Sequence, residues 1–223
     1  MRKAAPRTST ERPSLIDVNS PSVEVMRALR LALELRAEKE LASRILLTSA
    51  EPGAGKSTIA ANLALVSAMG GARVLLIDAD LLKSAQHGIF GLPRAPGLVE
   101  YLATGKRIDP FVQNGPGGLK IMAAGRPIPR TNEILASPRM AELLELVSAG
   151  YDAVIVDTPP VLASTAAASI ATHTGMDVVF VVSPTTRRHD VRRALRRLQL
   201  VDANVTGLIL NREGVPFEYG YGA

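Results

Sequence analysis

Cysteine is absent from this chain of 223 residues, and aromatic residues make up only 4% of it. Without cysteine the protein has no disulfides, thiolate zinc sites or cysteine nucleophiles, and redox chemistry is not expected. The three histidines, His87, His173 and His189, are too far apart in the sequence to form a local metal-binding cluster. With so few aromatic residues, the core has to be built from Leu, Val, Ile and Ala.

A long uninterrupted hydrophobic run is also missing. The best candidate, residues 60–77, is broken by Asn62, Ser67, two glycines and Arg73, so we expect no transmembrane segment. The N-terminal residues are basic but lack the apolar segment and the small-residue cleavage site of a secretory signal. We therefore expect a soluble protein in the cytoplasm.

The composition is otherwise that of one packed α/β domain. Apolar residues account for 47% of the chain, which excludes disorder, and the length leaves no room for a second full domain. The formal net charge of +5 permits an anionic partner such as nucleic acid, lipid headgroups or an acidic tail. Charge alone does not choose among these partners.

Three regions can be distinguished along the chain. Residues 1–19 are rich in Arg, Pro, Ser and Thr, and they predict a flexible basic arm. Residues 20–212 carry the folded domain, which we expect to begin with a helix whose N-cap is Ser20 and whose first position is Pro21, running to about Lys39. Residues 213–223 form a C-terminal tail that contains Tyr219 and Tyr221.

Within the domain, short apolar runs alternate with longer amphipathic segments. This alternation predicts a mainly parallel central sheet flanked by helices on both faces. Ligands of such sheets bind at the carboxyl ends of the strands. The expected strands include residues 45–47, 74–77, 121–122, 154–156, 178–182 and 208–210, and the expected helices lie near residues 57–69, 132–148, 163–173 and 188–200.

The first expected strand is followed by a phosphate-binding loop at residues 50–58, with alanine at its first fixed position. Glycines let backbone N–H groups approach phosphate oxygens, and the following helix adds its positive N-terminal end. Lys56 is expected to reach the β and γ phosphates of the nucleotide, and Ser57 to bind Mg²⁺. The predicted nucleotide-binding residues of the loop are Gly53, Ala54, Gly55, Lys56, Ser57 and Thr58.

Three aspartates follow two of the other expected strands. Asp78 and Asp80 come after residues 74–77, and side chains two apart on a strand project from the same face. Asp157 follows residues 154–156, where it is suited to hold a metal ion or its waters during phosphoryl transfer. These acids, Lys56 and Ser57 therefore predict one site, although a single aspartate at a strand end often only caps the next helix.

Taken together, these motifs resemble the bacterial tyrosine kinases of polysaccharide export, whose P-loop fold is related to that of the cell-division and partition ATPases. The resemblance covers roughly residues 17–212. The matching segments are Ser20-Pro21 followed by Glu24, Arg27 and Arg30, then residues 49–57, 75–80, 97–98, 133–137, 151–160 and 210–211.

The resemblance implies an ATP- and Mg²⁺-dependent tyrosine kinase. In the ring of identical subunits that it also implies, each copy phosphorylates tyrosines of a neighbouring copy. Tyr219 and Tyr221 are then the phosphoacceptors, although capping of a helix or strand is the alternative for these residues. The helix with Glu24, Arg27 and Arg30 is then the ring-forming contact, and otherwise a solvated ladder of intrahelical ion pairs. The resemblance also implies a membrane adaptor of the polysaccharide co-polymerase type, which recruits the protein to the inner face of the cell membrane.

Roles within the site follow from the same resemblance. One of Asp78 and Asp80 is expected to accept the proton of the tyrosine, while the other acts on the metal with Asp157; we assign the metal to Ser57, Asp80 and Asp157. Lys56 and backbone amides neutralise the developing phosphate charge. Asn211 is expected to contact the adenine, and otherwise is an ordinary turn residue.

The chain departs from the family pattern at four positions. The departures are Ala54 for a glutamate, Leu82 for an arginine, Ser84 for a proline and Ala166 for an aspartate. They leave open a second function, a nucleotide-gated regulator of a polysaccharide export complex with little kinase turnover. A third is a positioning ATPase of the related family, but those enzymes carry a lysine near the start of the loop, where this chain has Glu51.

An arginine-rich segment lies in the helix expected near residues 188–200. Its arginines surround an apolar stripe that we expect to pack on the sheet. Such a face can bind DNA phosphates or an anionic membrane surface, but a solvated basic face is more usual, and no aromatic residues are interleaved for base stacking. Nucleic acid is therefore an unlikely partner. The arginines are Arg187, Arg188, Arg192, Arg193, Arg196 and Arg197.

Overall fold

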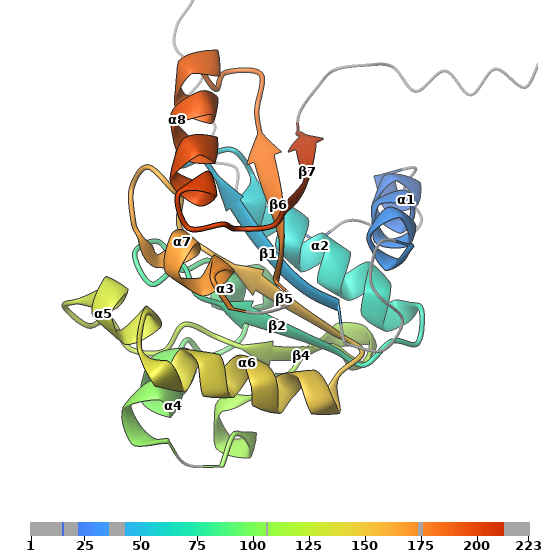
Figure 1. Ribbon diagram of the computed structural model, residues 1–223. Coiled ribbons are helices and arrows are strands. Elements are labelled where there is room, and N and C mark those ends of the chain that lie inside the picture. Colours follow the sequence, from blue (N-terminus) through green and yellow to red (C-terminus); the bar gives the residue numbers. More distant parts are fainter. Residues whose placement is uncertain (1–14, 16–21, 36–42, 106, 174–175, 212–223) are drawn as a thin grey trace, which may run out of the picture.

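The computed structural model describes residues 15, 22–35, 43–105, 107–173 and 176–211. Its centre is a seven-stranded sheet with the order β3-β4-β2-β5-β1-β6-β7 (Figure 1). All neighbouring strands are parallel except β3, which pairs antiparallel with β4. The strands are β1 (Ser43–Ser49), β2 (Val74–Asp78), β3 (Gln113–Asn114), β4 (Lys120–Met122), β5 (Ala153–Asp157), β6 (Met176–Val182) and β7 (Val205–Leu210).

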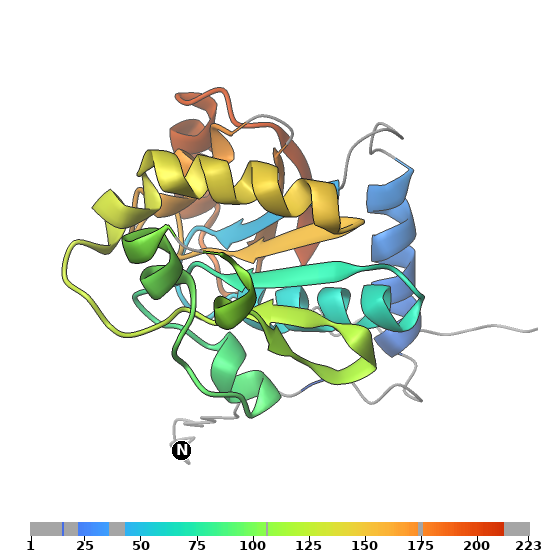
Figure 2. The same cartoon turned by 90° about the horizontal axis from the view of Figure 1, so that it is seen from below.

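Helices cover both faces of this sheet (Figure 2). One face carries α2, with α1 packed outside it, and the other carries α4 to α8. The helices are α1 (Ser22–Glu34), α2 (Lys56–Met69), α3 (Gln86–Phe90), α4 (Leu98–Thr104), α5 (Thr131–Leu135), α6 (Pro138–Gly150), α7 (Ala166–Ala171) and α8 (Arg188–Gln199), with short 3₁₀ turns at Asp109–Phe111 and Pro116–Gly118.

Helix α2 is apolar on nearly all sides because it is sandwiched between the sheet and α1. Ile59 and Leu63 pack toward the strands, and Leu29 and Leu33 of α1 pack against the same cluster. The N-terminus of α2 is fixed directly after β1, so the loop between them lies at the carboxyl edge of the sheet. Buried packing therefore holds the start of α2 at that edge.

The strand register brings the acidic residues to the same edge. Asp78 is the last residue of β2 and Asp157 the last residue of β5, and the two are direct neighbours in the pairing of these strands. Leu47 of β1 in turn pairs with Asp157, two residues before β1 ends. The ends of three adjacent strands thus converge where the first loop begins.

The predicted α/β class with a mainly parallel sheet is confirmed, and each expected strand is present. The single helix expected over residues 132–148 is wrong, because Pro138 begins a new helix after the break at residues 136–137. Helix α7 is shorter than the expected segment 163–173, and β3, α3 and α4 were not predicted. The expected helix start at Ser20-Pro21 lies outside the described residues, as do most of the basic arm and the tail. The expected run of this helix to about Lys39 is wrong, because α1 ends at Glu34 and Leu35 is in a turn.

No helix within the described ranges combines the length and the apolar character that crossing a membrane requires.

Candidate nucleotide-binding site

The loop between β1 and α2 has the backbone geometry of an anion-binding cradle. Gly53 and Gly55 both have positive φ angles, 87° and 92°, which side chains larger than hydrogen rarely adopt. A Cβ atom on Gly55 would lie 2.1 Å from the side-chain nitrogen of Asn211. The amide of Asn211 itself donates a hydrogen bond to the carbonyl of Ala54, at 2.8 Å. Asn211, directly after β7, therefore supports the backbone of the loop. The adenine contact expected of Asn211 stays a prediction.

A pocket of about 250 Å³ opens in front of this loop. It contains five of the six predicted loop residues; the sixth, Ala54, is buried against the core beneath α2. Asp80 also lines the pocket, whereas Asp78 and Asp157 are fully buried behind it. The lining residues are Pro52, Gly53, Gly55, Lys56, Ser57, Thr58, Asp80, Leu82, Lys83, Ala85, Pro160 and Ala163.

An ion pair joins the predicted phosphate-binding lysine to the second aspartate. The Nζ atom of Lys56 lies 2.8 Å from an oxygen of Asp80, and the two residues are 8% and 1% exposed. The other oxygen of Asp80 accepts a hydrogen bond from the backbone N–H of Lys83, at 2.9 Å. Both charges are thus compensated inside the protein, at the wall of the pocket.

Asp78 has a different environment. Its carboxylate accepts hydrogen bonds from the backbone N–H groups of Asp80, Ala85 and Gln86, at 3.0–3.2 Å. Strand β2 ends at Asp78, so the expectation that Asp78 and Asp80 share one face of a strand is wrong. The two acids do lie together, but through a turn that Asp78 holds in place.

Gln86, which is not among the predicted site residues, connects the parts of the site. Its side-chain amide is fully buried and donates to an oxygen of Asp157 at 2.8 Å and to the carbonyl of Ser57 at 3.1 Å. Its backbone N–H donates to Asp78. One residue therefore contacts the loop, β2 and β5. No signal in the sequence marks it, because its only distinction is its position in the fold.

The site fits a magnesium ion through an unsatisfied oxygen. The Oδ1 atom of Asp157 is buried and has no hydrogen-bond partner among the described residues. The side chain of Ser57 lies close enough to Asp157 to lower the pKa of its carboxyl. The described parts of the chain hold no cluster of three or more His, Cys, Asp or Glu suited to a metal. Mg²⁺ at nucleotide sites is usually held by one or two protein oxygens together with phosphate oxygens and water.

Burial raises the pKa values of the two fully buried acids, Asp78 and Asp157. Desolvation, followed by the negative charge of Asp157, raises the pKa of Asp78 to about 8, although the N–H donors of Gln86 and Ala85 act in the opposite direction. Burial likewise raises the pKa of Asp157, and the nearby Lys56 opposes this shift. In the absence of a cation, the folded protein therefore holds protons on this pair more tightly than the unfolded chain does.

The stability of the nucleotide-free protein should depend on pH accordingly. Between about pH 4 and 8 the unfolded chain has lost the proton of Asp78 while the folded state retains it, so the contribution of this group to the free energy of unfolding falls as pH rises. Asp78→Asn should reduce this fall, as measured by denaturant unfolding across the interval. Asp202→Asn, at an exposed position after α8, is the control and should leave the pH profile unchanged. Equal profiles for wild type and Asp78→Asn would contradict the expectation.

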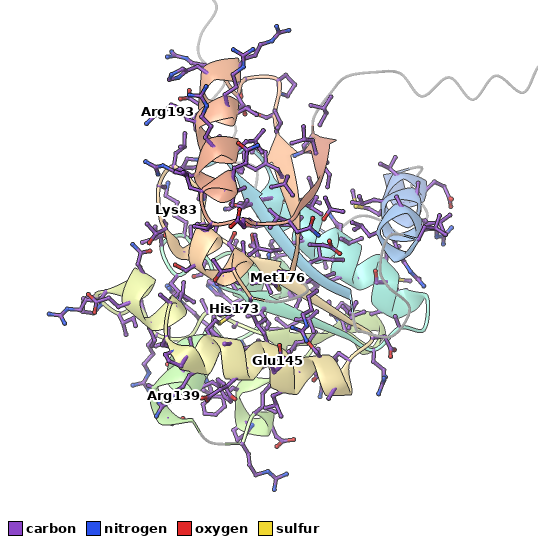
Figure 3. The ribbon with its side chains drawn as sticks, viewed as in Figure 1. Lys83, Arg139, Glu145, His173, Met176 and Arg193 are labelled. Atoms are coloured by element: carbon purple, nitrogen blue, oxygen red, sulfur yellow. The ribbon has the colours of Figure 1, made fainter. Side chains whose placement is uncertain are left out.

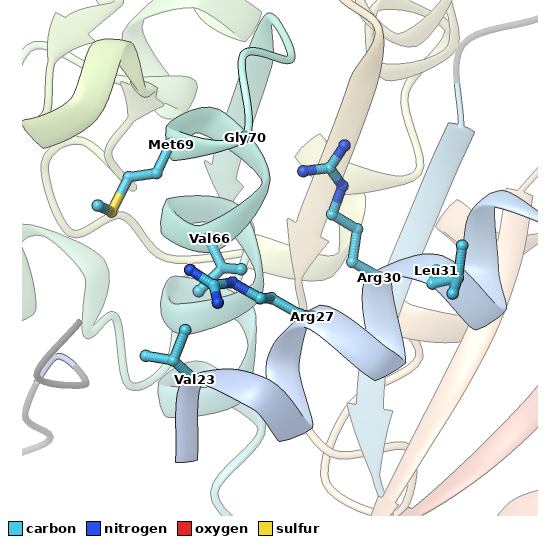
Figure 4. Close-up of a pocket in the computed structure, with 7 residues that line it drawn as sticks. All are labelled: Val23, Arg27, Arg30, Leu31, Val66, Met69 and Gly70. Carbon is cyan, nitrogen blue, oxygen red and sulfur yellow. The ribbon is translucent and has the colours of Figure 1, made fainter. Parts of the chain in front are cut away.

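The three predicted oligomerisation residues lie on α1. Arg27 and Glu24 form an ion pair within the helix, and both side chains are more than half exposed. Arg27 and Arg30 also line a pocket of about 320 Å³ between α1 and α2, where Arg27 extends over Val66 and the guanidinium of Arg30 lies against Gly70 (Figure 4). Ring formation therefore stays a prediction, and the predicted phosphoacceptors Tyr219 and Tyr221 lie outside the described residues.

Comparison with known proteins places this geometry in context. Residues 40–218 match a family model described as ParA, NUBPL iron-transfer P-loop NTPase. The chain is 38% identical over 207 residues to the putative tyrosine-protein kinase EpsB of Ralstonia solanacearum. The aligned region covers 92% of this chain but only 28% of EpsB. It is 34% identical over 211 residues to the tyrosine-protein kinase YwqD of Bacillus subtilis, covering 93% of the chain and 89% of YwqD.

Solved structures with a similar fold include further tyrosine kinase domains. The kinase domain of the Escherichia coli tyrosine kinase ETK is 33% identical with a TM-score of 0.80, and the match covers 89% of this chain and 80% of that one. The chimerical protein CapA2B2 is 32% identical with a TM-score of 0.81, covering 90% of this chain and 92% of that one. The chain thus spans nearly all of some relatives and about a quarter of others.

Proposed function

Because this chain belongs to the bacterial tyrosine-protein kinases, within the ParA-like P-loop NTPases, we propose that it transfers the γ-phosphate of ATP to tyrosine hydroxyls. The observation that carries the proposal is the pairing of Lys56 with Asp80 at the wall of the loop pocket. It places a cation for phosphate oxygens next to an anion that can accept a proton. The same pair can also serve hydrolysis of ATP, so the choice of tyrosine as the acceptor is supported by the tyrosine-protein kinase relatives.

The phosphate end of ATP would lie against the loop. Backbone N–H groups of the loop and the N-terminus of α2 face this position, and Lys56 would neutralise the charge that develops on the transferred group. Ser57 and Asp157 would hold Mg²⁺, which supplies further neutralisation of the phosphate oxygens when bound. Gln86 would keep the carboxylate of Asp157 in place through its 2.8 Å hydrogen bond.

Asp80 is the better candidate for the proton acceptor. It lines the pocket, whereas Asp78 is completely buried and its oxygens are occupied by three backbone N–H groups. When phosphate oxygens compete for Lys56, Asp80 loses its partner and becomes a stronger base for the tyrosine hydroxyl. Asp78 would then act as a positioning residue that fixes residues 80–86. The predicted contact of Asp80 with the metal stays a prediction.

The remaining assignments concern the assembly. We propose that the acceptors are Tyr219 and Tyr221, phosphorylated by a neighbouring copy in a ring whose contacts include Glu24, Arg27 and Arg30. The partner would be a membrane adaptor of the polysaccharide co-polymerase type, and the process regulated would be exopolysaccharide or capsule production. The protein would act at the cytoplasmic face of the membrane. Support comes from the family, in which the relative EpsB is called a putative tyrosine-protein kinase.

The proposal predicts where phosphate will be found. After incubation of the full chain with ATP and Mg²⁺ and with its adaptor, mass spectrometry should detect phosphate on Tyr219 or Tyr221, and the Tyr219→Phe/Tyr221→Phe double variant should lose it. Tyr101 is the internal control, because it is 7% exposed and packs edge-on against Phe111. ATP hydrolysis without any phosphotyrosine would instead favour a regulatory module or a positioning ATPase.

A further inference from the structure

The exposed half of α8 carries arginine and no carboxylate. Its apolar residues Ala194 and Leu198 are fully buried against the sheet, and Asp190, the one acid of the helix, lies on the buried side as well. Figure 3 shows side chains projecting outward from α8, Arg193 among them. The exposed residues of the helix are Arg188, His189, Arg192, Arg193, Arg196, Arg197 and Gln199.

This arrangement works against the stability of the helix. Like charges four residues apart repel each other, and α8 contains three such pairs: Arg188 with Arg192, Arg192 with Arg196, and Arg193 with Arg197. Arg188 also stands in the first turn, where the positive end of the helix dipole disfavours a cation. An ordinary solvated helix alternates charges of opposite sign, so this face differs from the usual pattern.

Little within the protein offsets the repulsion. Asp190 lies 3.5 Å from Arg193, and Arg197 donates to the carbonyl of Val161, at 3.0 Å. Throughout the described ranges, Arg188, Arg192 and Arg196 have no carboxylate partner. These three side chains share one side of the helix, since they are spaced four residues apart. A surface rich in phosphate would relieve their mutual repulsion.

A leucine on the same side indicates what kind of surface this is. Leu200 follows the last turn of α8 in helical conformation, four residues after Arg196, and it is 84% exposed. Nucleic acid phosphates offer no favourable contact to an aliphatic side chain, and the face has no aromatic residue for base stacking. At a lipid interface, by contrast, cationic side chains contact headgroup phosphates while leucine is buried at the boundary with the acyl chains.

We propose that the arginine face of α8, together with Leu200, binds the anionic headgroups of a membrane surface. Guanidinium groups are suited to this because each can donate two parallel hydrogen bonds to one phosphate. The interaction does not depend on the proposed kinase activity, because it uses none of the residues of the nucleotide pocket. It would hold the chain at a membrane in addition to any adaptor protein.

The test is co-sedimentation of the full chain with vesicles of phosphatidylglycerol and phosphatidylcholine, and with phosphatidylcholine alone. We expect binding only to the anionic vesicles, weakening as salt is raised. Arg192→Glu/Arg196→Glu should reduce the binding at least about tenfold, since each arginine near such a surface contributes roughly a fivefold gain. Arg107→Glu/Arg126→Glu is the matched control, with the same change in charge at exposed positions at the other end of the sheet.

Further variants separate the alternatives. Leu200→Ser should lower vesicle binding about threefold or more without affecting any binding to duplex DNA. Lys56→Met/Asp80→Asn, which removes both charges of the buried pair, should bind vesicles as wild type does, so failure of the kinase proposal leaves this measurement intact. Equal loss in the α8 variant and the control would overturn the proposal, because it would reflect net charge alone. Absence of vesicle binding would also overturn the proposal. So would binding to duplex DNA that is stronger than the binding to vesicles and is unchanged by Leu200→Ser.

Discussion

Replacing Lys56 with methionine should lower the rate of ATP-dependent tyrosine phosphorylation by at least about 10²–10³-fold, as measured by phosphate incorporation into the full chain. Lys56 is the one cation of the loop, it lines the nucleotide pocket, and its ammonium group lies within the ion pair with Asp80. Without it, phosphate oxygens lose their charged partner in the transition state. Lys83→Met is the matched control, because Lys83 lines the same pocket and is largely exposed. We expect it to retain most of the activity.

The same substitution also affects folding, and a second variant separates the two effects. Lys56→Met leaves the carboxylate of Asp80 buried without its cation, which costs about 3–5 kcal/mol of stability for a buried pair. Lys56→Met/Asp80→Asn removes both charges and should recover most of this loss in urea unfolding while remaining inactive. A double variant that is stable and active would show that the pair does not take part in the reaction.

The second large effect is expected from Gln86→Met. Methionine has a similar size but cannot donate hydrogen bonds, so Asp157 and the carbonyl of Ser57 both lose the amide that joins them. Residues that orient a metal ligand in this way typically change metal affinity by about 10–100-fold when replaced. We therefore expect the affinity for ADP in the presence of Mg²⁺ to fall by roughly this factor, measured by titration calorimetry.

The affinity for ADP in the presence of a chelator should change much less, because Gln86 lies behind the lining of the pocket. Gln113→Met provides the comparison, since the amide of Gln113 also donates to a backbone carbonyl, that of Pro93, at 2.9 Å. Its ADP affinity should match wild type with and without Mg²⁺. An equal loss of affinity with and without Mg²⁺ in Gln86→Met would indicate a collapsed loop rather than a mispositioned Asp157.

The sequence allowed the sheet and the loop to be predicted because each is encoded locally. Continuous apolar runs such as residues 74–77 are typical of strands buried on both faces, and the spacing of Gly53, Gly55 and Lys56 specifies a phosphate cradle whatever surrounds it. The convergence of Asp78 and Asp157 followed from the rule that parallel strands end at one edge, and their pairing in the β2–β5 register agrees with it.

What could not be predicted depends on tertiary contacts. Nothing local distinguishes Gln86 from an exposed glutamine, yet it is buried because the turn after Asp80 folds back over β5. The difference between Asp78 and Asp80 also escaped prediction, since it arises from where β2 ends and from which backbone N–H groups lie near each carboxylate. The pattern predicted which residues meet at this edge of the sheet, and packing decided which acid is accessible.

The bracing of the loop by Asn211 limits how far the chain can deliver its terminal tyrosines. Tyr221, the more distant of the two, lies ten residues beyond Asn211 in the sequence, so even a fully extended chain carries its Cα atom no more than about 36 Å from that anchor. For Tyr219, eight residues beyond Asn211, the corresponding limit is about 29 Å. Any neighbouring copy that phosphorylates either tyrosine must therefore present its catalytic pocket close to this radius of the first copy's loop.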